Sequence, residues 1–351
     1  MDRFRVETLV IPSARAGQVL SVKTYTPIDP PHKAANSEPL TLVLAHANGF
    51  HKELWEPVLQ GIALSGKDSP LCQATRAVND FSSGPQPIIT PGHSTAWHIC
   101  RVIAYDCWNH GQSAILNQDQ LDIPVTWHKN AHDILAIVRQ LVTDTTVIGI
   151  GHSLGACSLM LAQLFRPTTF KALLIIEPAL VLSDKEPASD VVKGALKRKN
   201  HWNDWETAQM YFDNHWLFKQ WDPRTRQLHI DHGLYQTNSP SKHLQLKCAP
   251  QHESQTFATG YYDAKWIIDH FGEMSCPLEM LLGRASYLYP MPEVIHIVAS
   301  FSRQLPTRVI EDTGHLVLME SPDTTAVEIT RFLHRATALG QNPSLDLKSQ
   351  L

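Results

Sequence analysis

A serine between two glycines, in Gly151-His152-Ser153-Leu154-Gly155, constrains the fold of this sequence more than any other feature. The apolar run Thr145–Ile150 before it is typical of a buried strand, and the pattern Leu154–Phe165 after it is typical of a helix. The flanking glycines allow a sharp corner between the two without a Cβ clash. Such a corner lifts a serine hydroxyl clear of a sheet, in front of a helix N-terminus that favours negative charge. We therefore predict that Ser153 is a nucleophile.

Short apolar runs alternate with helical patterns along the rest of the sequence. Further strands are expected at Thr41–Ala45, Ile99–Tyr105, Lys171–Ile176, Pro277–Leu282 and Pro306–Ile310, and further helices at Asn130–Val142 and Thr324–Leu339. The runs are continuous and bounded by glycine, proline or polar residues, as in strands covered on both faces. Strands that alternate with helices pair in parallel through right-handed crossovers. The expected class is α/β, with a mostly parallel central sheet flanked by helices.

Two segments interrupt this alternation. Residues 65–98 are rich in Ser, Pro, Gly and Gln and are expected to form a surface insertion. Residues 178–272 lack clear strands and carry many aromatic residues at the spacing of amphipathic helices, which predicts a helical cap or lid. The core is then made of residues 1–177 and 273–351. A length of 351 residues fits one domain with such a lid.

A nucleophilic serine needs a base, and position selects one among the 19 histidines. In strand–turn–helix sites of this kind the chain order is serine, acid and histidine, with the histidine after the last strand. His315 lies in such a place, behind the predicted strand Pro306–Ile310 and before the final helix. His296 and His334 lie within helical patterns and are expected on the surface.

The acid is expected at the end of a strand. It commonly follows the penultimate strand, but there the sequence has Ser286. Glu177 ends the apolar strand after the nucleophile, where a carboxylate is costly to bury without a partner. We therefore predict that Glu177 orients His315 and stabilises its protonated form. Asp312 is the alternative, although only three residues before His315 it is better placed to shape that loop.

Two backbone N–H groups are expected to bind a developing oxyanion. The first belongs to Leu154, directly after the nucleophile. The second comes from the loop His46–Phe50, most simply from Asn48 between two small residues. Asp106 and His110 are interpreted as structural residues that tie down the loop beneath the nucleophile by hydrogen bonds.

Composition excludes several other classes of protein. Thirty basic residues against 34 acidic ones leave no positive excess for nucleic acid or an anionic membrane. The six cysteines form no C-x-x-C pair, and neither His128 with His132 nor His229 with His232 has the ligands of a metal site, so no metal and no cofactor are predicted. No segment is apolar and long enough to span a membrane, and no secretory signal is seen, so a reducing intracellular compartment is expected.

The last three residues suggest a targeting signal. Ser349-Gln350-Leu351 is similar to the peroxisomal tripeptide Ser-Lys-Leu, with Gln350 in place of the basic residue. The sequence therefore predicts a peroxisomal protein with an import receptor as a partner, and a cytoplasmic protein if the tripeptide is not used.

Taken together, these motifs resemble those of the α/β-hydrolase family over nearly the whole chain. A closer resemblance, to fungal peroxisomal α/β-hydrolases, is carried by His46–Glu53 with Trp55-Glu56-Pro57, by Ile176-Glu177-Pro178, and by Leu246–Pro250 with Glu253. That group includes toxin-biosynthesis hydrolases, an acyl-CoA hydrolase of the mycophenolic acid pathway and a peroxisomal lipase. It is similar in placing its acid at the position of Glu177, and it implies an α/β-hydrolase fold with a helical cap.

The resemblance implies a serine hydrolase of fungal secondary metabolism. Its substrate would be an acyl thioester of the acyl-CoA type, or a carboxylic ester, with a bulky lipophilic acyl group. An acyltransferase would use the same acyl-enzyme, and a non-catalytic ligand-binding protein would use the same fold, so both stay open as alternatives. The basic run Lys193–Lys199 is either a solvated helix face or a clamp for coenzyme A phosphates.

Overall fold

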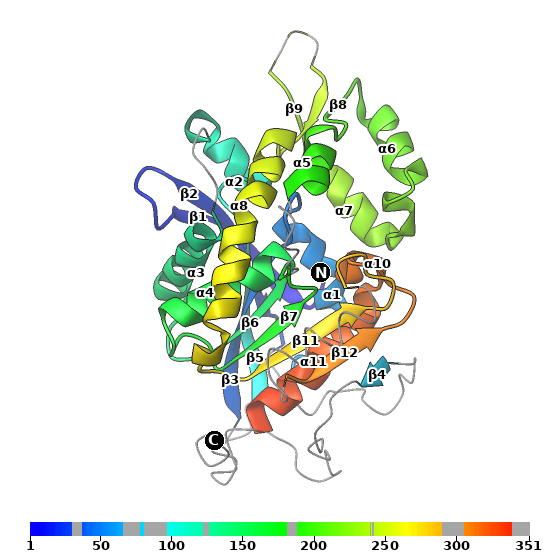
Figure 1. The fold of residues 1–351 in the computed structure, drawn as a ribbon. Coiled ribbons are helices and arrows are strands. Elements are labelled where there is room, and N and C mark those ends of the chain that lie inside the picture. The colour runs from blue at the N-terminus through cyan, green and yellow to red at the C-terminus, as the bar shows by residue number, and fades with distance from the viewer. Residues whose placement is uncertain are drawn as a thin grey trace.

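The computed structural model describes residues 1–29, 37–65, 78–80, 97–121, 126–180, 188–238, 240, 242–289 and 305–338. Within these ranges a central sheet has the strand order β1-β2-β5-β3-β6-β7-β11-β12-β4 (Figure 1). Its strands are β1 (Phe4–Pro12), β2 (Val19–Pro27), β3 (Glu38–Ala45), β4 (Val78–Asp80), β5 (Trp97–Tyr105), β6 (Thr146–His152), β7 (Ala172–Ile176), β11 (Leu278–Gly283) and β12 (Thr307–Ile310).

The strands predicted from the sequence make up the parallel centre of this sheet. From β5 through β3, β6, β7 and β11 to β12, each strand runs parallel to its neighbour. The predicted α/β class is therefore confirmed. The two edges were not predicted: β1 and β2 form an antiparallel hairpin that joins β5, and β4 joins β12 antiparallel. Most side chains of β1 are not buried, so this edge strand lacks the continuous apolar run that identified the others.

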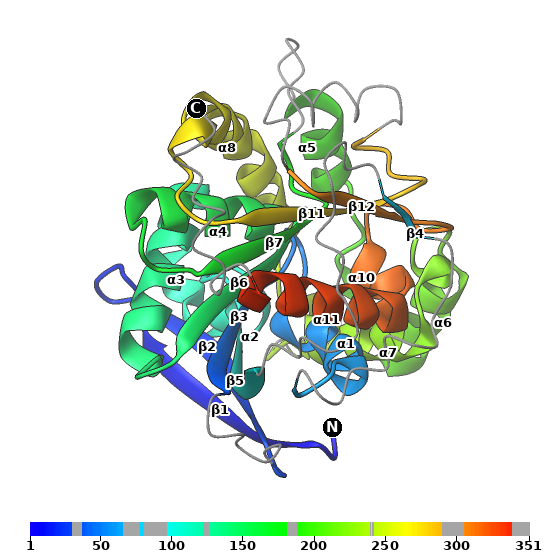
Figure 2. The ribbon, with the colours of Figure 1, turned by 90° about the horizontal axis from the view of Figure 1, so that it is seen from below.

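Helices cover both faces of the sheet. They are α1 (Glu56–Gly61), α2 (Gly111–Leu116), α3 (Trp127–Leu141), α4 (Leu154–Phe165), α10 (Val317–Glu320) and α11 (Pro322–Ala338), with the short 3₁₀ turns η1 (Lys52–Trp55) and η2 (Gln118–Gln120). Figure 2 shows α1 and α11 on one side of the sheet and α3 and α4 on the other. The predicted helices at 130–142, 154–165 and 324–339 correspond to α3, α4 and α11.

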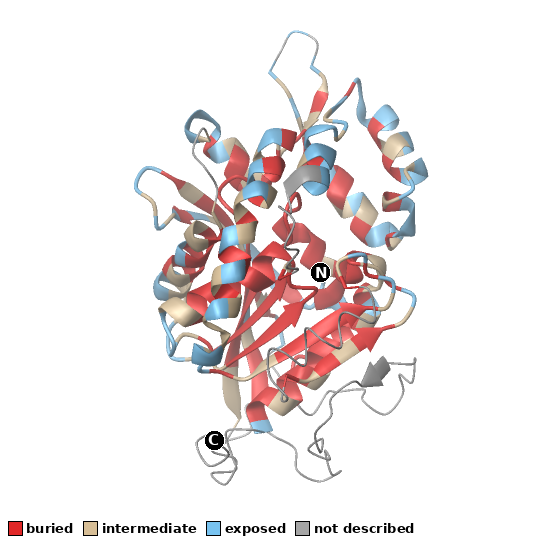
Figure 3. Ribbon diagram, in the orientation of Figure 1, coloured by how far each residue is buried: buried red, intermediate tan, exposed pale blue. Residues whose placement is uncertain are grey.

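Each face of the sheet therefore has its own apolar core. Strand β3 illustrates this, because Leu42 and Leu44 pack in the cluster beneath α1 and α11, whereas Val43 and Ala45 pack in the cluster beneath α3 and α4. Burial on both faces explains the continuous apolar runs of the central strands. Figure 3 shows that the buried residues concentrate in these strands and in the inner sides of the helices. The two apolar cores thus hold the central strands in place up to their carboxyl ends.

The segment between β7 and β11 is mainly helical. It contains α5 (Ala188–Leu196), α6 (Trp205–Asn214), η3 (Phe218–Gln220), α7 (Pro223–Gly233), α8 (Pro250–Asp269) and η4 (Phe271–Glu273). The expectation that it lacks strands is wrong, because β8 (His201–Trp202), β10 (Leu244–Leu246) and β9 (Leu234–Gln236) form a small antiparallel sheet. Strands of two or three residues are too short to show an alternating pattern. Through Ala264 and Ile267, helix α8 also packs into the apolar core shared by α3 and α4.

One expected surface residue is buried instead. His334 on α11 is buried, and its ring lies 5.3 Å from that of Trp97. The helical pattern did not show which side of α11 faces β5, so His334 was wrongly assigned to the surface. His296, the terminal tripeptide 349–351 and all of 66–96 except the backbone of β4 lie outside the described residues. None of the helices in the described ranges is both long and apolar enough to cross a membrane.

Candidate active site

Ser153 occupies a strained corner between β6 and α4. Its φ is 53° and its ψ is −114°, a conformation that L residues rarely adopt. The two glycines beside it are required by close packing. A Cβ at Gly151 would lie 2.6 Å from the Ala156 nitrogen, and one at Gly155 would lie 2.2 Å from the Ala45 carbonyl oxygen. The sequence thus forces the corner, and the corner sets the hydroxyl at the carboxyl end of the sheet.

His315 and Glu177 meet Ser153 at this edge. The Nε2 atom of His315 lies 3.2 Å from the Ser153 hydroxyl oxygen, and its Nδ1 atom lies 3.0 Å from Oε2 of Glu177. Ser153, His315 and Glu177 are only 5%, 7% and 0% exposed. Asp312, the alternative acid, is an exposed residue with a φ of 58° and forms no hydrogen bond with His315 within the described chain. The three predicted residues therefore form one hydrogen-bonded chain that excludes Asp312.

The Glu177 carboxylate is held from the loop after β11. The backbone N–H of Gly283 donates to Oε1 at 2.7 Å, and the Ser286 hydroxyl donates to Oε2 at 2.6 Å. Burial raises the pKa of Glu177, and these two hydrogen bonds oppose that rise because they favour the charged form. The role of Ser286 was missed in the sequence, where it stood only as the residue that replaces an acid.

The loop that carries His315 is fixed from two sides. Glu320 accepts hydrogen bonds from the backbone N–H groups of Gly314 (2.7 Å) and Leu316 (3.3 Å). Nε2 of the buried His152 lies 2.9 Å from the His315 carbonyl oxygen and donates to it. Burial lowers the pKa of His315, which keeps its imidazole neutral and able to accept a proton near neutral pH. His152 and Glu320 were also missed, since neither contact follows from sequence spacing.

The predicted oxyanion loop lies against the start of α4, as the close approach of Gly155 to the end of β3 requires. Gly49 has a φ of 81°, and its N–H donates to Nε2 of His110 at 2.9 Å. The Asn48 side chain donates to the Glu253 carbonyl oxygen at 3.0 Å. The Asn48 backbone therefore has a defined position next to the corner that carries Ser153 and Leu154.

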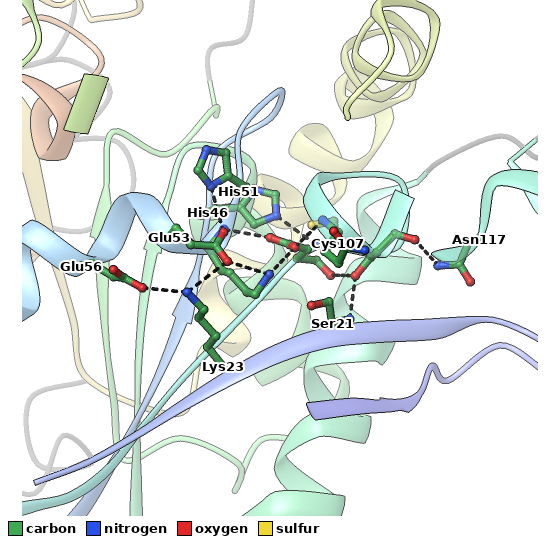
Figure 4. A network of polar contacts seen from close by, with 12 residues as sticks. Ser21, Lys23, His46, His51, Glu53, Glu56, Cys107 and Asn117 are labelled. Atoms are coloured by element: carbon green, nitrogen blue, oxygen red, sulfur yellow. Dashed lines mark hydrogen bonds and ion pairs between the residues drawn. The ribbon is translucent and has the colours of Figure 1, made fainter. Parts of the chain in front are cut away.

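A buried ionic network anchors this loop (Figure 4). Asp106 accepts from the backbone N–H of Lys52 at 2.9 Å and from its ammonium group at 2.6 Å. Lys52 also pairs with Glu53 at 3.1 Å, and Lys23 lies 3.4 Å from the same carboxylate. Burial alone lowers the pKa of Lys52, but the carboxylates of Asp106 and Glu53 raise it above its ordinary value. Asp106 and His110 thus hold the 46–53 segment, which contains the predicted oxyanion loop, to the 106–113 loop.

The comparison with known proteins decides the family. Residues 42–328 match the model of the alpha/beta hydrolase family. The chain belongs to this α/β-hydrolase family.

Among curated relatives of this hydrolase, the type I acyl-CoA thioesterase mpaH of Penicillium roqueforti is 24% identical over 213 residues, which cover 58% of this chain and 42% of mpaH. The peroxisomal membrane protein LPX1 of Saccharomyces cerevisiae is 25% identical over 167 residues, 46% of this chain and 36% of LPX1. The abhydrolase domain-containing protein AKT2 of Alternaria alternata is 23% identical over 235 residues, 56% of this chain and 86% of AKT2. The matched regions thus span less than half of mpaH and LPX1.

A solved structure supports the same fold. The crystal structure of the yeast peroxisomal α/β-hydrolase Lpx1 superposes with a TM-score of 0.76 at 20% identity, covering 96% of this chain and 90% of Lpx1. The resemblance to the family and to its fungal peroxisomal members is therefore confirmed.

The remaining candidate residues of the hydrolase lie in packed positions. His128 contacts Asp263, and His229 stacks on His51 with ring centroids 5.5 Å apart. No group of three or more metal-binding side chains occurs among the residues that the structure describes. In the basic run, Arg198 pairs with Glu253 at 3.0 Å.

Proposed function

We propose that this α/β-hydrolase is a serine hydrolase that cleaves an acyl thioester of the acyl-CoA type, or a carboxylic ester. The observation that carries the proposal is the hydrogen-bonded chain from Ser153 through His315 to Glu177, with distances of 3.2 and 3.0 Å. A nucleophile, a base and an orienting acid in this order are what acyl transfer to a serine requires. The Ser153 corner and the buried site fit the same chemistry.

In the proposed reaction, the Ser153 oxygen attacks the acyl carbonyl carbon while its proton moves to Nε2 of His315. Glu177, which accepts from Nδ1–H, stabilises the imidazolium that forms. The backbone N–H groups of Asn48 and Leu154 bind the oxyanion, and each such donor typically contributes ~10²–10³ in rate. The tetrahedral intermediate then collapses, the C–S or C–O bond breaks, and the imidazolium protonates the departing sulfur or oxygen to give a free thiol or alcohol. Water, activated by the same imidazole, releases the acid from the acyl-enzyme.

The proposed substrate has a bulky lipophilic acyl group. Its class is supported by the names of relatives such as mpaH, an acyl-CoA thioesterase. In this proposal residues 1–177 and 273–351 form the core, 65–98 a surface insertion, and 178–272 a helical cap. Apolar aromatic side chains cluster in that cap, with the Phe212 and Phe218 rings 4.7 Å apart and the Trp202 and Phe212 rings 5.2 Å apart. These rings are buried in the core of the cap, and in this proposal a cap rich in apolar side chains covers the lipophilic acyl group.

The proposed setting is the peroxisome of a fungus, in secondary metabolism such as toxin biosynthesis. Support for the peroxisome comes from the name of the relative LPX1, and support for a fungal source comes from relatives such as AKT2 of Alternaria alternata. An import receptor that reads Ser349-Gln350-Leu351 would then be a partner. Loss of peroxisomal localisation of an N-terminally fluorescent fusion when these three residues are deleted supports the targeting signal, and unchanged localisation contradicts it.

Hydrolysis of a panel of acyl-CoA thioesters and matched simple esters tests the proposed activity. The expected result is release of free thiol or alcohol by the wild-type chain and none above background by Ser153→Ala. Full turnover by Ser153→Ala contradicts the mechanism. Transfer of the acyl group to an added alcohol or amine, in preference to water, would instead support an acyltransferase.

A further inference from the structure

A basic cavity of about 790 Å³ lies apart from the proposed active site. Its walls come from the β1–β2 turn, from α3, from the end of α4 and from Trp108. Its lining includes three arginines, which are Arg15, Arg139 and Arg166. None of the proposed catalytic residues lines it. Its volume lies within the range typical of small-molecule sites.

The three arginines of this basic cavity outnumber the carboxylates among its described lining residues. Asp133 is the one acidic residue in the lining, and it already accepts from the Ser13 hydroxyl at 2.6 Å and the Ala14 N–H at 2.8 Å. Arg15, Arg139 and Arg166 form no ion pair with any carboxylate in the described ranges. Like charges gathered in a concave, partly desolvated site create a strong positive potential.

Several hydrogen-bond donors in the walls have no partner within the described part of the chain. Arg15 Nη1, Gln18 Nε2 and Trp108 Nε1 are buried atoms of lining residues, and none of them donates to a group in the described chain. Gln18 is 3% exposed and Trp108 is 1% exposed. A buried donor without a partner costs free energy, so each calls for an explanation. Because Gln18 and Trp108 are closed to solvent, the arginine side chains are the groups that a bound polyanion would contact.

Hydrogen bonds hold the β1–β2 turn that carries Arg15 in a defined conformation. The N–H of Ser13 donates to the Gln18 carbonyl oxygen at 3.0 Å, and the Gln18 N–H donates to the Arg15 carbonyl oxygen at 3.2 Å. The side chain of Gln120 clamps the turn from outside by donating to the Gly17 carbonyl oxygen at 2.9 Å. A site whose groups are already fixed loses little entropy when a ligand binds.

We propose that this cavity binds a small soluble molecule that carries a pyrophosphate group, either a nucleoside diphosphate or inorganic pyrophosphate. Guanidinium groups match phosphate oxygens in a bidentate geometry, and several of them match a multiply charged anion. The half-buried lining residue Phe165 offers apolar surface beside the cations. This site does not depend on the proposed hydrolase activity.

Titration calorimetry of the full chain with ADP, inorganic pyrophosphate and adenosine tests this site. ADP and pyrophosphate should bind saturably and adenosine should not. Arg15→Ala and Arg166→Ala should each weaken binding at least about tenfold, since each removes a charged hydrogen-bonding group. Arg5→Ala is the matched control, because Arg5 is a 70% exposed guanidinium on β1 outside the cavity, and it should bind like the wild type.

The results distinguish a nucleotide from free pyrophosphate as the ligand, and they show whether the site exists. Tighter binding of ADP identifies the nucleotide, and equal binding of pyrophosphate identifies the phosphates alone as the recognised group. Absence of saturable binding, equal binding of adenosine, or equal losses in Arg5→Ala overturns the proposal, as does binding only to anionic lipid vesicles. If Arg15→Ala or Arg166→Ala proves unfolded by circular dichroism, the exposed Arg139→Gln variant replaces it. Ester hydrolysis should be unchanged in these variants, so failure here is distinct from failure of the proposed function.

Discussion

The hydroxyl of Ser286 donates to the Glu177 carboxylate at 2.6 Å, on the same Oε2 atom that faces His315. The loop after β11 therefore supports an acid that comes from the end of β7. Because Glu177 is fully buried, this donor is one of few groups that favour its charged form.

Substitution Ser286→Ala should lower kcat at least about tenfold with little change in KM. It removes a hydrogen bond to a buried charged group, worth about 1.5–3 kcal/mol, and so weakens the support for the imidazolium. Steady-state kinetics on the best acyl substrate checks this. Ser275→Ala is the control, since Ser275 donates to the Pro167 carbonyl oxygen outside the site and its loss should leave kcat unchanged. Equal kcat values for the two variants would contradict the role given to Ser286.

Glu177→Gln should cost far more activity than Asp312→Asn. An amide at 177 can no longer stabilise the imidazolium, and we expect kcat to fall by roughly 10³–10⁴. Asp312 is exposed and forms no hydrogen bond with His315 in the described part of the chain, so its substitution should change kcat less than about threefold. Kinetics of both variants, with circular dichroism as a check of folding, decides between them. If Asp312→Asn lost more activity than Glu177→Gln, Asp312 and not Glu177 would be the acid that orients His315.

The pH dependence of kcat/KM should reflect the pKa of the buried base His315. Burial lowers the pKa of His315, and only the neutral imidazole accepts the Ser153 proton. Activity should therefore persist below the ordinary histidine pKa of about 6.5 and be lost as the pH falls through the lowered value. The measurement is a pH–rate profile from about pH 9 down to the lowest pH at which circular dichroism shows an intact fold. An acidic limb with its midpoint at or above pH 6.5 would be inconsistent with the buried site.

Asp106→Asn should destabilise the fold. It leaves the buried Lys52 ammonium with Glu53 as its remaining carboxylate partner, and breaking a buried ion pair typically costs about 3–5 kcal/mol. Urea unfolding gives the change in the free energy of unfolding. The control Asp231→Asn alters an exposed residue that accepts from Gln227, and it should change stability by less than about 0.5 kcal/mol. A loss below about 1 kcal/mol for Asp106→Asn would show that the network is not a major anchor.

The sequence predicted the centre of the fold because central strands are buried on both faces and therefore read as continuous apolar runs. The hairpin β1–β2 escaped prediction because its outer strand is mostly exposed, and β8, β9 and β10 escaped because they are only two or three residues long. The position of His334 depends on which side of α11 meets Trp97, which a helical pattern alone does not specify.

The residues of the candidate site also differ in whether the sequence alone could indicate them. The sequence could single out Ser153, His315 and Glu177 as candidates because each follows a strand at one edge of the sheet, where chain order limits the choices. Ser286 and His152 were not, since a serine or histidine side chain bonds to whatever the tertiary fold brings within about 3 Å. Residues that position a site are therefore harder to identify from a sequence than the residues proposed to react.

Labelling with a fluorophosphonate, followed by intact mass spectrometry and peptide mapping, tests the central claim most directly. An activated serine beside a neutral imidazole reacts with such a probe, whereas an ordinary buried serine does not. The wild-type chain should gain one adduct, mapped to Ser153, and Ser153→Ala should gain none. An unlabelled wild-type chain, or an adduct that persists in Ser153→Ala, would contradict the assignment of Ser153 as the nucleophile of this hydrolase.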